Sequence, residues 1–63
     1  MLKRFIMTVE GPNLNDVSEI ELPALPSEGE PIETRFGTCI VSSVDDRRSE
    51  DGVYQGRIVC RMP

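Results

Sequence analysis

Apolar and polar residues alternate along much of the chain, and this alternation is its main structural signal. Successive side chains of a β-strand point to opposite faces, so a two-residue period predicts a strand with one face on a core. Phe5, Met7 and Val9 have this period within residues 1–10. We expect these three side chains to share one buried face. The Gly-Pro-Asn sequence at residues 11–13 then predicts a turn, because each of its residues favours turn conformations.

Residues 15–22 fit two local structures. Ile20 and Leu22 alternate with glutamates, which indicates a half-buried strand. The spacing of Asp16 and Glu19 instead resembles a helix capping box. We favour the strand, because the segment before the next proline is too short for a stable helix. This strand would pair with the first one as a hairpin.

The middle of the chain contains a proline-rich connector followed by a predicted hairpin. Three prolines within residues 23–31 argue against a helix or a central strand there, so we expect an extended connector. Residues 31–44 are the predicted central β-hairpin, with a tight turn at Gly37. Its second arm has apolar residues on both faces, which predicts a strand covered on both sides at one end. Residues 22–44 resemble the entry into the central hairpin of small SH3-like barrels, a resemblance that concerns the fold alone.

The last third of the chain begins with a charged segment and ends with a further apolar pattern. Residues 45–52 contain no apolar side chain, which predicts a solvated loop. The final strand is predicted over residues 53–62, with Tyr54 and Ile58 on its core face. Gly56 interrupts this strand and predicts a bulge or a sharp bend.

These segments together predict residues 1–63 to be a single small β domain. The expected fold is all-β: a five-stranded antiparallel meander, either an SH3-like barrel or a partly open barrel. A chain of 63 residues is short, and a domain of this size buries only about 60% of the surface that its unfolded chain exposes. Such a thin core favours association with a partner or with a second copy.

Charge is unevenly distributed along this acidic chain. The formal net charge is −4. Residues 1–34 hold two cations against seven carboxylates, whereas residues 35–63 hold five arginines against four carboxylates. A net acidic domain repels the phosphate backbone, so nucleic acid is an unfavourable partner.

The residue types that support catalysis or metal binding are scarce. The chain has two cysteines, Cys39 and Cys60, and no histidine. Zinc sites use three or four Cys or His ligands, and a nucleophilic thiol needs a nearby base. We therefore expect no metal, no cofactor and no enzymatic activity. Two buried thiols are favoured over a disulfide, on the expectation of a soluble cytoplasmic protein without a signal peptide or a membrane span.

One group of residues suggests binding. Arg35, Arg57, Arg61 and Tyr54 combine guanidinium groups with an aromatic ring, a combination that binds acidic peptides or single-stranded nucleic acid. The alternative is that these arginines form cross-strand ion pairs with nearby glutamates on a solvated face. We predict a non-catalytic interaction module that binds a protein partner, or itself, through an edge strand or this arginine-bearing face. A nucleic-acid-binding small barrel that uses the three arginines is the alternative function.

Overall fold

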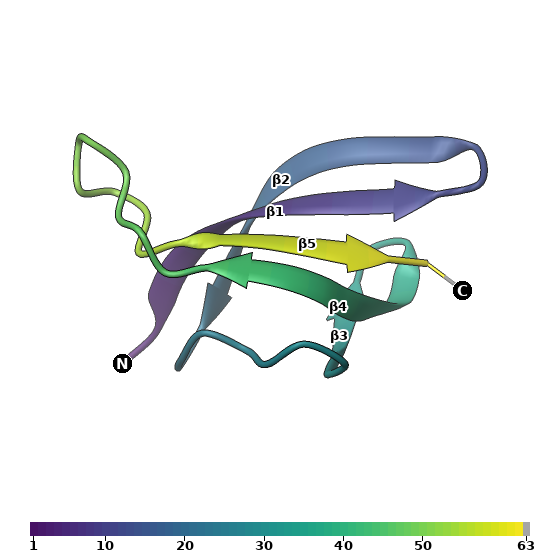
Figure 1. The fold of residues 1–63 in the computed structure, drawn as a ribbon, viewed down its shortest axis with the longest axis horizontal. Helices are drawn as coiled ribbons and strands as arrows, with labels where there is room; N and C mark the ends of the chain where they lie inside the picture. The colour runs from purple at the N-terminus through teal and green to yellow at the C-terminus, as the bar shows by residue number, and fades with distance from the viewer. Residues whose placement is uncertain (63) are drawn as a thin grey trace.

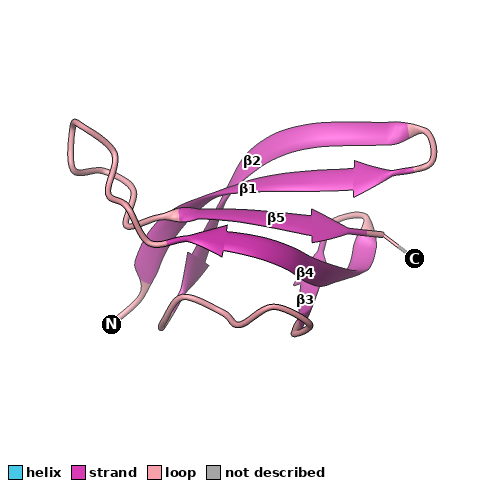
Figure 2. Cartoon of the chain, viewed as in Figure 1, coloured by secondary structure: helices cyan, strands magenta, loops and turns pink. Residues whose placement is uncertain are grey.

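The chain folds into β-structure. The computed structural model describes residues 1–62, which form five strands and contain no helix (Figure 2). The strands are β1 (Lys3–Gly11), β2 (Leu14–Leu22), β3 (Pro31–Thr34), β4 (Gly37–Asp45) and β5 (Arg57–Arg61). The all-β prediction with five strands is therefore confirmed. Residues 1–62 accordingly include no helix of the length and apolarity that crossing a membrane requires.

All five strands belong to one sheet, in the order β2-β1-β5-β4-β3. The sheet curls into a half-barrel, with β2 and β3 at its two edges (Figure 1). Three of the neighbouring pairs are antiparallel, but β1 and β5 are parallel. The antiparallel prediction is right for these three pairs, but the meander prediction is wrong in two respects: β1 pairs with β5 in parallel, and β2 does not pair with β3.

The parallel pair follows from the number of strands. The chain reverses four times: at the β1–β2 hairpin, in the connector along the open end of the sheet, at the β3–β4 hairpin and in the loop between β4 and β5 (Figure 1). The fifth strand of such a series therefore runs in the same direction as the first. When the curling sheet places β5 beside β1, the two strands pair in parallel from Ile6 opposite Arg57 to Glu10 opposite Arg61.

The core lies on the concave face of the sheet. Its buried side chains alternate along the strands, as the two-residue period predicts. They are Phe5, Met7, Val9, Ile32, Cys39, Val41, Ile58 and Cys60. Half-buried apolar residues of β2, β4 and the connector pack around this cluster. The core is thin, and it receives side chains from one face of the sheet only.

The strand interpretation of residues 15–22 is confirmed, because β2 pairs with β1 along its whole length. The connector then crosses the end of the core in an extended form. Leu25 packs against the core and Pro26 is buried, so the connector covers the end of the half-barrel. A turn at Glu28 and Gly29 ends the crossing; Gly29 has φ of 90° and its amide donates to the carbonyl of Val41 at 2.8 Å.

The predicted central hairpin forms, but its turn lies at residues 35 and 36, just before the predicted Gly37, which begins β4 with φ of 114°. Its second arm differs from the prediction. A register shift between Val41 and Ser43 changes the alternation of β4, so that Val44 packs against the core while Ile40 stays exposed. The apolar residues that the sequence pattern assigns to both faces of this strand therefore result from a bulge, and they do not show that both faces are covered.

The last strand is shorter than predicted. It begins at Arg57, so residues 53–56 are not part of it, and Tyr54 is half-buried outside the core. Gly56 explains the break. It is buried against the end of β4, and a Cβ atom on it would lie 2.5 Å from the backbone oxygen of Asp45. The chain bends at Gln55, next to this glycine and outside the strand, and the bulge lies in β4.

Candidate functional site

The curled sheet leaves a cleft between its two edge strands, which we call the seam. The cleft has a volume of about 270 Å³. Met7 of β1 lies at its floor, residues 18–20 of β2 form one wall, and residues 33–36 of β3 and its turn form the other. The wall-forming strands each have a neighbour on one side only, because they are the ends of the sheet. A strand edge of this kind presents unpaired backbone N–H and C=O groups.

The turn after β3 is fixed by local hydrogen bonds. The Thr34 hydroxyl donates to the carbonyl of Gly37 at 2.8 Å and accepts the amide of Phe36 at 3.1 Å. A hydroxyl that bonds its own backbone two residues ahead holds a tight turn in place. This arrangement keeps Phe36 at the rim of the seam, where 38% of its surface is exposed.

Arg35 spans the seam. Its Nη2 atom lies 3.0 Å from Oδ2 of Asp16 on β2, and its guanidinium lies 5.2 Å from the ring centroid of Phe36. The Asp16 side chain is 27% exposed and the Arg35 side chain 67%, so solvent screens the ion pair strongly. Pairs of this kind contribute about 0.2–1 kcal/mol. The contact therefore links the two edges weakly and can be broken by an entering ligand.

The structure distributes the four residues predicted for binding over three places. Arg35 lies at the seam. Arg57 and Tyr54 line a hollow of about 400 Å³ beneath the 46–56 loop, on the outer side of the sheet. Arg61 lies further along β5, where its Nε atom is 3.9 Å from Oε1 of Glu10. The three arginines do not form one continuous basic face.

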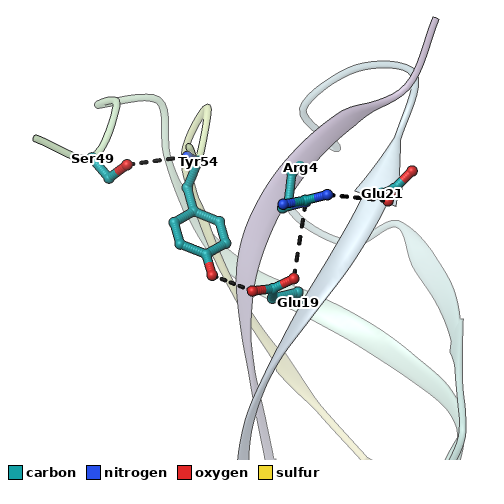
Figure 3. A network of polar contacts seen from close by, with 5 residues as sticks. All are labelled: Arg4, Glu19, Glu21, Ser49 and Tyr54. Atoms are coloured by element: carbon teal, nitrogen blue, oxygen red, sulfur yellow. Dashed lines mark hydrogen bonds and ion pairs between the residues drawn. The ribbon is translucent and has the colours of Figure 1, made fainter. Parts of the chain in front are cut away.

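Tyr54 attaches the loop to the sheet through a polar network (Figure 3). Its hydroxyl donates to Glu19, and its amide donates to the Ser49 hydroxyl at 3.0 Å. Arg4 lies between two carboxylates of β2, with its Nε 3.9 Å from Glu19 and its Nη2 3.8 Å from Glu21. The hydrogen bond to Glu19 is the main cause that raises the pKa of Tyr54 above its ordinary value of 10.0. The network explains Tyr54 as a residue that positions the loop.

Two carboxylates organise the loop from within. Asp51 accepts the Ser49 hydroxyl at 2.6 Å and the amide of Val53 at 3.0 Å, and these bonds lower its pKa below 3.8. Asp45 accepts the amide of Arg47 at 2.9 Å, which is the main cause of its lowered pKa. Both carboxylates therefore act as local turn formers. Over residues 1–62 no group of three or more potential metal ligands gathers.

The two cysteines lie on neighbouring strands of the core. Both side chains are fully buried and both thiols are free. Burial, followed by a hydrogen bond with the Cys39 thiol, raises the pKa of the Cys60 thiol to about 12. A thiol is nucleophilic only when it is ionised, so Cys60 is held in its unreactive form. The expectation of two buried thiols is borne out in this structure.

Sequence reasoning missed the seam as a site. Its apolar residues, among them Met7 and Ile20, carry the alternation of ordinary core residues. Their position at a cleft depends on which strands form the edges of the sheet, and this depends on the non-local pairing of β1 with β5. The available signal was the odd number of predicted strands. It implies a parallel pair between the first and last strands when the sheet curls, and β2 and β3, which the proline-rich connector separates and which do not pair, are then the edges.

Comparison of the chain with models of protein families, with curated proteins and with solved structures gives no match in any of the three. Function is therefore inferred from the geometry of this chain.

Proposed function

We propose that the protein is a non-catalytic interaction module that binds an extended segment of a protein partner in the seam. The main observation that supports this proposal is that two strand edges face each other across a cleft with an apolar floor. An extended peptide that adds a strand to such an edge gains main-chain hydrogen bonds, and pockets for alternate side chains give specificity. The half-barrel would then close around its ligand.

The geometry also supports a direction for the bound segment. β2 and β3 run in opposite directions, because β2 is antiparallel to β1 and β3 has the direction of β5. An inserted strand must therefore be antiparallel to one edge and parallel to the other. β2 has nine residues and β3 has four. Antiparallel pairing with the longer edge is the more stable choice.

A peptide library displayed on phage tests this function. Peptides selected on the 63-residue protein are titrated into isotopically labelled protein, and the amide shifts of β2 and β3 are followed by nuclear magnetic resonance. Phe36→Ala, at the rim of the seam, should weaken binding several-fold. Ile40→Ala is the matched control, because Ile40 is exposed to a similar extent, 40% against 38%, and does not line the seam. Selected peptides that shift only residues outside the seam would overturn the proposal.

The other partners considered from the sequence have less support. The separation of Arg35, Arg57 and Arg61 removes the continuous basic face that the nucleic-acid alternative requires. Self-association through the edges would bring identical acidic strands together. We expect a monomer in analytical ultracentrifugation at physiological salt. Kinship with SH3-like barrels is a further proposal, which rests on the resemblance of residues 22–44 and on the small curled sheet.

A further inference from the structure

The net charge of the protein is concentrated in the segment of the chain that contains both edge strands of the seam. Residues 14–36, which comprise the two edge strands, the connector and the turn, contain six carboxylates and one guanidinium, a net charge of −5. Residues 1–13 contribute +1 and residues 37–63 contribute zero, so the remainder of the chain is nearly neutral. The acidity noted for the first half of the sequence is thus a property of one region of the fold.

Few cations neutralise this region. Arg35 pairs with Asp16, and Arg4 lies at 3.8–3.9 Å from Glu21 and Glu19. Within residues 1–62, the other three carboxylates of the region, Glu28, Glu30 and Glu33, form no ion pair. These carboxylates are exposed. Of these three, Glu33 lines the seam together with Glu19, whereas Glu28 and Glu30 lie on the connector; an approaching ligand therefore meets two carboxylates and one guanidinium, Arg35, along the seam.

Asp16 faces inward and pairs with Arg35, but at the next positions along the seam the two walls place their charges and their apolar groups on opposite sides. In β2, Glu19 belongs to the outward-facing set and Ile20 to the inward-facing set. In β3, Glu33 is exposed and the adjacent Ile32 is buried. Side chains of an inserted strand would alternate in the same way. Its outward residues would lie between Glu19 and Glu33, and its inward residues would lie over the apolar floor.

We infer that the seam selects an extended basic segment in which Lys or Arg alternates with apolar residues. This inference rests on the proposed function and specifies its ligand. Opposite charges on neighbouring strands stabilise pairing, and like charges destabilise it. The same charges disfavour a second copy of this chain as the ligand, since its edge strands carry the same excess of carboxylates.

The composition of the selected peptides tests the inference. Among phage-selected peptides that shift the amides of β2 and β3, Lys and Arg should be enriched at every second position, with apolar residues between them. Neutral or acidic peptides that bind at the seam would overturn this inference and leave the proposed function intact. A library that gives no binder at the seam would remove the proposed function and the inference with it.

A charge reversal supplies the matched comparison. Glu33→Lys at the seam should weaken binding of a selected basic peptide by about tenfold, because it replaces an attraction between neighbouring strands with a repulsion. Glu50→Lys makes the same change in net charge on the 46–56 loop and should alter affinity by less than about twofold, because Glu50 lines the hollow beneath the loop and is not among the residues that line the seam. Equal effects of the two variants would show that only net charge matters and would refute selection at the seam. Affinity of the unmodified protein should also fall as salt is raised, a readout that needs no variant.

Discussion

Gly56 gives the sharpest stability prediction, because its environment leaves no room for a side chain. A Cβ atom at this position would lie 2.5 Å from the backbone oxygen of Asp45. That oxygen belongs to the last residue of β4, which pairs with Arg57 at the start of β5. The backbone of Gly56 is itself held, since its carbonyl accepts the amide of Ile6 at 3.2 Å. Relief of the clash must therefore shift paired backbone.

The magnitude follows from these contacts. Overpacking that shifts backbone costs about 1–3 kcal/mol. Replacing glycine with alanine also restricts the unfolded chain, which returns about 0.4–1 kcal/mol when the native φ is compatible. Gly56 is not among the glycines with positive φ, so this gain applies. We expect Gly56→Ala to lower the free energy of unfolding by about 1–2 kcal/mol, and the melting temperature by about 4–16 °C.

The matched control is Gly11→Ala. Gly11 also has no positive φ, and the nearest atom to its added Cβ would be the Cβ of Leu14 at 3.4 Å, which is an ordinary side-chain contact. Thermal and urea unfolding followed by circular dichroism should leave this variant unchanged or slightly stabilised. A Gly56→Ala protein as stable as the parent would refute the reasoning. Equal losses in both variants would show a general intolerance of alanine in these segments.

Three further predictions concern ionisable groups. The absorbance titration of Tyr54, the one tyrosine, should have a midpoint above 10, and Glu19→Gln should lower it while Glu21→Gln should not. Since folding raises the pKa of Tyr54, the stabilisation from its hydrogen bond to Glu19 is present below pH 10 and is lost as pH rises through the pKa of the folded protein. A midpoint unaffected by Glu19→Gln would contradict the assignment of the raised pKa to this bond. The Cys60 thiol, with a pKa of about 12, should react with a disulfide reagent only at the rate of unfolding; rapid reaction of folded protein would disprove its burial. Asp51 has a lowered pKa, so its contribution is present above pH 3.8 and is lost as pH falls through the folded value. Asp51→Asn should make stability less sensitive to acid in urea unfolding at several pH values, and an unchanged acid dependence would count against it.

The elements that the sequence predicts well are those determined by neighbours in the chain. β1 and β2 follow from an uninterrupted two-residue period joined by a turn-forming tripeptide, so both strands and their pairing are predicted. The connector follows from its prolines. The turn before Gly37 follows from the conformational freedom of glycine, which adopts φ of 114° there. In each case the residues that determine the structure lie within the segment itself.

The features that the sequence does not predict depend on contacts between distant segments. Residues 53–56 have a strand pattern, but β5 begins only at Arg57, after the close approach of Gly56 to Asp45, although residues 55 and 56 still form backbone hydrogen bonds with β1. The alternation of β4 is interrupted where the Ser42 hydroxyl donates to the carbonyl of Val59 at 3.1 Å beside the register shift. The predicted arginine-bearing face is absent for the same reason, namely that its residues are positioned by contacts between distant segments. Arg35 and Arg57 are both positively charged and both lie in the second half of the chain, but the curled sheet places them at different clefts.

The central position of β5 has a consequence for how this protein acquires its structure. The β1–β2 and β3–β4 hairpins are joined within the sheet only by β5, which lies between them. A two-stranded hairpin is at best marginally stable in water. Both hairpins can form early from local contacts, yet neither gains lasting stability until the fifth strand enters the gap and contacts both. Assembly is therefore limited by the most distant pairing in the chain, and we expect folding to be slow for a protein of this size.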